Sequence, residues 1–177
     1  MRRLIVAAAV LMMHIAAFAQ TESERYEQRY DMLVSQFGAA GVGVETVLDN
    51  WEKVDSTNAK LLLARFNYLF TKAQSVSVVM KDNKKYLGME PILTFKDSLQ
   101  RNVYCYQETF FDDELYGKAV KAVDKAISVH PDRLDFRFVK ANALIAYEKE
   151  SPDMALPYLL DLAGKVFPMN LYAQIVP

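Results

Sequence analysis

Few side chains in this sequence could serve as nucleophiles, general bases or metal ligands. Histidine occurs twice, at His14 and His130, and cysteine occurs once, at Cys105. The chain therefore has almost no residues from which to build a Ser–His or Cys–His catalytic pair, or a metal site with two histidines. His130 precedes a proline at the end of a predicted helix, where we expect it to face the helix dipole at the surface.

The remaining candidates for chemistry have simpler structural explanations. The run Asp112-Asp113-Glu114 could hold a cation or act as an acid pair, but helix capping and compensation of the helix dipole explain it more directly. Cys105 lies in a predicted strand with no histidine or basic residue beside it, so we expect a small core residue rather than a reactive thiol. We predict no catalytic, cofactor-binding or metal-binding residue, and no enzyme.

Tyr104 and Tyr106 flank the cysteine and point to the same face of the predicted strand. Two tyrosines on one face could stack on a sugar or a peptide. Packing onto a helix is the simpler expectation, because tyrosine combines a large apolar ring with a polar tip.

Residues 1–19 have the order of a cleavable signal peptide. Arg2 and Arg3 precede an apolar stretch, residues 4–18, and Ala17-Phe18-Ala19 has the small-x-small pattern of a cleavage site. The stretch is shorter than the roughly 20 residues of a transmembrane helix. We expect a periplasmic or secreted protein that begins near Gln20 and has no stable membrane insertion after cleavage. An uncleaved membrane anchor is the alternative.

The composition is that of an ordinary globular domain. Apolar residues make up 52% of the chain and charged residues 24%, and the formal net charge is −1. Removing Arg2 and Arg3 with the signal peptide takes this charge to −3. Nucleic acid therefore gains no electrostatic support as a partner. With a single cysteine no internal disulfide can form, and the fold must be stable through packing alone.

Apolar residues recur at helical spacing over most of the chain. This periodicity, with capping residues before it and glycine or proline after it, predicts six helices: 22–37, 42–54, 57–73, 113–129, 132–149 and 152–166. The third is apolar on nearly every side, which is typical of a helix buried in the middle of a stack. Between the third and fourth helices, alternating residues and short β-type runs predict a small β-containing insertion over 75–108.

The chain resembles tetratricopeptide-repeat proteins, best over residues 116–168. The residues that carry the resemblance match the second helix and closing proline of such a repeat: Tyr116, Ala119, Val123, Ala126, Ile127 and Pro131. Pro131 and Pro168 lie 37 residues apart, close to the repeat period of about 34. Phe66 and Arg137 depart from the pattern, because the family has a small residue at the first position and a large apolar residue at the second.

The resemblance implies a mainly α fold, a right-handed stack of antiparallel helical hairpins. The hairpins would be 22–54, 57–73 with 113–129, and 132–166, within a single domain of residues 20–177 that carries the 75–108 insertion. The first helices of such a stack line a concave groove that takes peptides. That groove would present Arg65, Asn67, Lys140 and Asn142, although Asn67 could instead make an internal hydrogen bond.

The sequence thus favours an exported, non-catalytic interaction or scaffold module that binds an unidentified protein or peptide. A substrate- or glycan-binding component of a cell-envelope uptake system is the alternative. Residues 169–177 resemble the start of a further helix. This segment either covers the last helix of the stack as a lid, or leaves that helix open to self-association through the C-terminal end.

Overall fold

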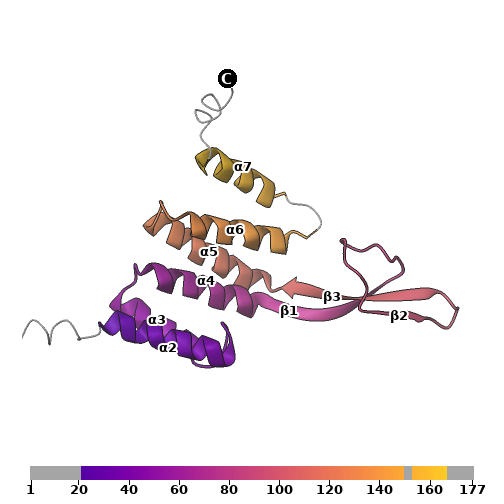
Figure 1. Cartoon of the computed structure of the whole chain (residues 1–177), viewed down its shortest axis with the longest axis horizontal. Helices are drawn as coiled ribbons and strands as arrows, with labels where there is room; N and C mark the ends of the chain where they lie inside the picture. Colours follow the sequence, from indigo (N-terminus) through magenta and orange to yellow (C-terminus); the bar gives the residue numbers. More distant parts are fainter. Residues whose placement is uncertain (1–20, 150–152, 167–177) are drawn as a thin grey trace, which may run out of the picture. The chain divides into compact units, whose positions relative to one another are not determined.

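The computed structural model describes residues 21–149 and 153–166, and within them it contains six helices and one three-stranded sheet (Figure 1). In chain order these elements are α2 (Glu22–Phe37), α3 (Val44–Val54), α4 (Ala59–Ala73), β1 (Gln74–Lys81), β2 (Leu93–Lys96), β3 (Asn102–Phe111), α5 (Asp113–Val129), α6 (Leu134–Tyr147) and α7 (Ala155–Val166). The expected class, mainly helical with a small β-containing insertion, is confirmed. The predicted signal peptide and the C-terminal segment 169–177 lie outside the described residues.

None of the described helices is both long enough and apolar enough to cross a membrane. The chain divides into two compact units, with the boundary between residues 61 and 62 near the start of α4. Each unit is described by itself below.

The first unit is built around the pair α2 and α3. Thr21 begins α2 with a capping box, in which its hydroxyl accepts from the Glu24 N–H and its own N–H donates to the Glu24 carboxylate. The helix ends at Gly38, whose φ of 80° favours glycine. One face of α3 is buried, and Trp51 on that face lies 6.3 Å from the ring of Tyr30.

A small polar network completes the buried tryptophan of this unit. The indole N–H of Trp51 donates to Ser23 Oγ at 2.8 Å, and Ser23 Oγ donates to Asp55 Oδ2 at 3.3 Å. Asn58 Nδ2 donates to the same carboxylate at 3.2 Å. The start of α2, the end of α3 and the turn before α4 are therefore joined through side chains. This network gives the buried indole the partner that it needs.

In the second unit, small residues let the helices approach closely. Ala119 and Ala126 on α5, Ala141 on α6 and Ala155 on α7 are all buried. α5 packs against α6, and α6 packs against α7. The buried hydroxyl of Tyr116 donates to a backbone carbonyl of α6, and its ring stacks on Tyr147 of α6 at 4.0 Å. Burial, with the charges of neighbouring groups, raises the pKa of Tyr116 to about 12.

The sheet has the order β1-β3-β2 and is antiparallel throughout. β1 follows α4 without a loop, and β3 leads into α5, whose N-cap Asp112 accepts from the Leu115 N–H as the sequence predicted. The strands extend further than expected. β3 reaches Phe111 because Thr109, Phe110 and Phe111 continue the pairing with the first residues of β1.

Candidate functional site

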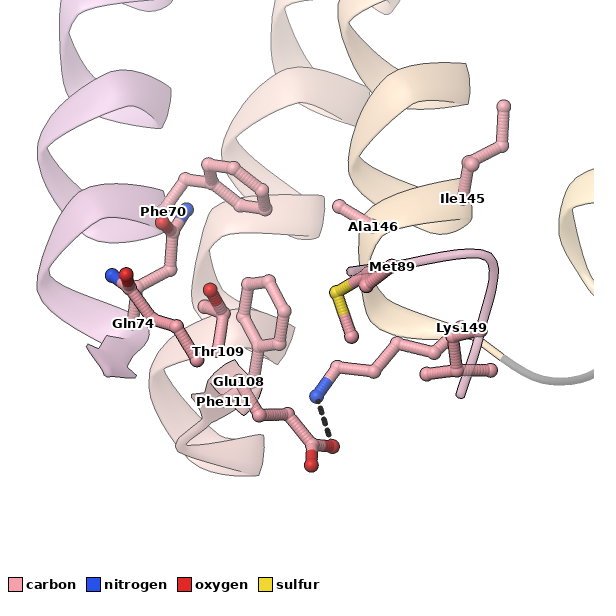
Figure 2. A pocket seen from close by; sticks show the side chains of 11 residues that line it. Phe70, Gln74, Met89, Glu108, Thr109, Phe111, Ile145, Ala146 and Lys149 are labelled. Carbon is pink, nitrogen blue, oxygen red and sulfur yellow. Dashed lines mark hydrogen bonds and ion pairs between the residues drawn. The ribbon is translucent and has the colours of Figure 1, made fainter. Parts of the chain in front are cut away.

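A groove of about 480 Å³ lies in the second unit, within the roughly 300–1,000 Å³ range of small-ligand pockets. Its walls come from the end of α4, the second half of β3, the loop between β1 and β2, and the end of α6 (Figure 2). Most of its lining is apolar, and these side chains are Phe70, Leu87, Met89, Phe111, Ile145 and Ala146.

A cluster of aromatic rings forms the rigid part of the groove. Phe70 lies 5.5 Å from Phe111, and Phe111 lies 5.6 Å from Tyr116 and 5.7 Å from Tyr147. Aromatic pairs at these separations add attraction beyond the area that they bury. The two phenylalanines in the groove are therefore held by the core of the unit. Ile145, by contrast, is 48% exposed in the same groove, so apolar surface there is open to a ligand.

The polar rim of the groove contains an ion pair between Glu108 and Lys149. Glu108 Oε1 accepts from Lys149 Nζ at 2.9 Å, and Glu108 Oε2 accepts from the Tyr86 hydroxyl at 2.9 Å. The Lys149 ammonium also lies 4.8 Å from the ring centroid of Phe110. The bond from Lys149 lowers the pKa of Glu108, and the hydrogen bond from Tyr86 lowers it further. A carboxylate stabilised in this way is a poor proton donor or base near neutral pH.

The loop between β1 and β2 is fixed over one face of the sheet. The buried Tyr106 of β3 donates its hydroxyl to the carbonyl oxygen of Lys84 at 2.6 Å, and its ring lies 5.2 Å from that of Tyr86. The Lys81 ammonium lies over the ring of Tyr86, 4.3 Å from its centroid. Tyr106 was expected to pack onto a helix. It packs beneath this loop instead, because the loop folds over β3, where the carbonyl oxygens of Asn83 and Lys84 accept from the Tyr106 hydroxyl.

A strained turn in this loop aims apolar side chains at the groove. Leu87 has a φ of 48° and Gly88 a φ of 72°, and the Met89 N–H donates to the Tyr86 carbonyl at 2.8 Å. Two successive positive φ values are the pattern of a type I′ turn. A leucine in the left-handed region costs about 1–2 kcal/mol. Such strain clusters at functional sites, and here both Leu87 and Met89 line the groove.

The four residues expected to line a concave groove lie elsewhere. Arg65 and Asn67 are half-buried on α4 but are two positions apart, and residues i and i+2 of a helix do not share a face. Lys140 is paired with Asp124 at 2.7 Å and is 18% exposed, while Asn142 is exposed. None of the four lines the 480 Å³ groove.

Sequence reasoning missed the residues that do form the groove. Glu108 and Lys149 are 41 positions apart, so no local spacing connects them. The one available signal was the alternation of side chains along a strand. Glu108 is two residues from Tyr106 and therefore lies on the same strand face as the tyrosine. The aromatic residues at the ends of α4 and β3 were visible in the sequence, but their convergence depends on the pairing of β1 with β3.

The residues first considered for chemistry have structural roles in the described chain. Cys105 is buried in β3, as predicted. Asp112 caps α5, Asp113 accepts from the hydroxyl of Tyr147, and Glu114 pairs with Lys118. Within residues 21–149 and 153–166, no group of three or more histidine, cysteine or acidic side chains could hold a metal ion. Comparison with protein families, curated proteins and solved structures finds no match.

Proposed function

We propose that this chain is an exported, non-catalytic interaction module whose groove receives an extended segment of a protein partner. The observation that carries the proposal is the combination of an open apolar lining with a rim whose charges are already paired. Phe70, Phe111 and Ile145 supply the lining, and Glu108 and Lys149 neutralise each other at the rim.

This combination favours an uncharged, apolar segment over a charged small molecule. A charged ligand would have to compete with the Glu108–Lys149 pair, whereas an apolar side chain gains from leaving water for the lining. Gln74, Gln107 and Thr109 also line the groove, and their amides and hydroxyl can bond to a backbone. A groove of about 480 Å³ has room for a few side chains of such a segment.

A tetratricopeptide-like stack is our proposal for the arrangement that supports this groove. In its favour, helices α5, α6 and α7 contact one another in succession, and the buried alanines lie where the resemblance places small residues. Export is proposed from the order of charge, apolar stretch and small residues in 1–19.

Selection of binding peptides from a random library, using purified protein that starts at Gln20, tests the function. The selected peptides should carry apolar residues, and their titration should shift the NMR signals of Ile145 and Thr109. Ile145→Glu should weaken binding at least tenfold because it puts a charge in the lining. Leu160→Glu on α7 is the matched control, since Leu160 is also exposed, at 66%, but does not line the groove.

Failure to select any peptide, or signals that shift away from the groove, would remove the basis of the proposal. Sugars selected in place of peptides, with the same residues affected, would replace it with the glycan-binding alternative.

A further inference from the structure

The sheet has one covered face and one open face. The loop between β1 and β2 covers the face that carries Tyr106. The other face, which we call the open face, carries apolar side chains of β1 and β2 that are 40–67% exposed: Val76, Val78, Met80, Leu93 and Phe95. Antiparallel sheets usually leave a polar face in water, so an apolar one marks an interaction surface.

The outer edge of β1 is free as well. β1 stands at one end of the sheet order, and six of its eight residues are exposed to solvent, including all five from Gln74 to Val78. The strand is eight residues long and carries one charged side chain, Lys81 at its end. Proteins normally protect such an edge with charges, proline or a bulge, and β1 has no proline and is paired without interruption from Gln74 to Lys81.

The backbone register shows which groups of β1 the edge presents. The Asp112 N–H donates to the Ala73 carbonyl at 2.8 Å, which makes this a hydrogen-bonded pair. Bonding residues alternate along an antiparallel strand, so the odd-numbered residues of β1 bond to β3. The N–H and C=O groups of Val76, Val78 and Met80 therefore point outward.

We propose that this edge pairs with β1 of a second copy of the chain, antiparallel, with Val78 opposite Val78. A two-fold axis perpendicular to the sheet keeps the open faces of both copies on the same side. The axis through Val78 places Val76 opposite Met80, so each outward-pointing residue of this set meets another apolar residue. Lys81 then lies opposite Ser75, and no like charges face each other.

The same residues favour this register over the neighbouring registers, and the length of β1 limits the size of the interface. Shifting the axis by one residue keeps the open faces together but sets Val76 opposite Asp82, or Met80 opposite Gln74. Stable complexes bury about 1,200–2,000 Å² in total, more than one pair of eight-residue strands provides. We therefore expect a dimer that dissociates in the micromolar range. This inference uses the outer edge of β1, of which Gln74 alone also lines the groove, and it does not depend on the peptide-binding proposal.

Sedimentation of the protein that starts at Gln20, over about 1–200 µM, tests the dimer. A monomer–dimer equilibrium is expected, and hydrogen exchange at the amides of Val76, Val78 and Met80 should slow as the concentration rises. A monomer over the whole range would overturn the proposal. Protection of these amides only when a selected peptide is added would assign the edge to another protein, and would overturn it equally.

Paired charge variants test the register. Val76→Lys combined with Met80→Glu places opposite charges across the axis and should dimerise. Val76→Lys combined with Met80→Lys places like charges there and should be monomeric. The two variants change the same positions, and circular dichroism of both establishes that they fold. Leu99→Lys, at an exposed position away from β1, should dimerise like the unchanged chain. Equal dimerisation of the two double variants would place the contact elsewhere and overturn the proposal.

Discussion

The ion pair at the rim of the groove should stabilise the second unit in a pH-dependent way. Replacing Glu108 by Gln or Lys149 by Met removes one partner and keeps a side chain of similar size. The side chains are 12% and 26% exposed, so solvent screens this pair less than an ordinary surface pair. We expect a coupling free energy of about 1 kcal/mol at pH 7, the upper end for pairs near a surface.

The sign of the pH dependence follows from the lowered pKa of Glu108. Its ordinary value is 4.5, and in the folded chain the pKa lies below that value. The stabilisation is therefore complete above the unfolded pKa and is lost as the pH falls through the folded pKa. Once the pH lies below the folded pKa, the protonated carboxyl no longer attracts the ammonium, and the coupling should approach zero.

A double-mutant cycle measures this coupling, with urea unfolding followed by circular dichroism at pH 7 and at a series of lower pH values. The pair Glu114–Lys118 on α5 is the control, because it has a similar geometry at 2.6 Å but is 79% and 53% exposed. Its coupling should be about 0.3–0.5 kcal/mol. A rim coupling no larger than that of the control, or one that does not decrease as the pH is lowered below 4.5, would refute the role given to burial and charge.

Three further expectations concern packing and processing. Ser23→Ala leaves the buried indole N–H of the only tryptophan without its partner and should cost about 1–3 kcal/mol, with a change in its fluorescence, whereas Ser35→Ala at an exposed position should have little effect. Ala126→Leu overpacks a fully buried position and should lower the free energy of unfolding by about 1–3 kcal/mol. Lys121→Ala on the exposed side of the same helix should stay within about 0.5 kcal/mol, and equal effects of the two would contradict the helix orientation. Mass measurement of the secreted protein should find an N-terminus at or near Gln20, and recovery of the uncleaved form alone in membranes would contradict export.

The local parts of the fold could be predicted because their signals are local. Thr21 and Glu24 are three residues apart, and this spacing alone predicts the capping box that begins α2. Asp112 predicts the start of α5 in the same way. The alternation around Cys105 predicts a strand with the cysteine turned to the opposite face from its two tyrosine neighbours.

The groove could not be predicted, because its residues converge from four separate segments. Phe70 and Phe111 meet only after β1 and β3 pair, and Lys149 reaches Glu108 only after α6 has packed on α5. Arg65 and Asn67 were assigned to one surface through a repeat pattern. That pattern fixes which residues are small or large, but it does not override the angle of about 200° between positions i and i+2 of a helix.

Because Cys105 is buried, the rate at which its thiol reacts with a reagent measures how often the sheet around it opens. The thiol is 5% exposed in the middle strand, between Met80 on one side and Leu93 on the other, and it is the only thiol in the chain. Because Met80 and Leu93 pair with Cys105, the thiol lies on the open face, and a thiol-reactive reagent can reach it only when the side chains that cover it there move aside. At high reagent concentration the labelling rate then equals the rate of this local opening. The unmodified protein can therefore report, at one known atom, how often the centre of its sheet is exposed.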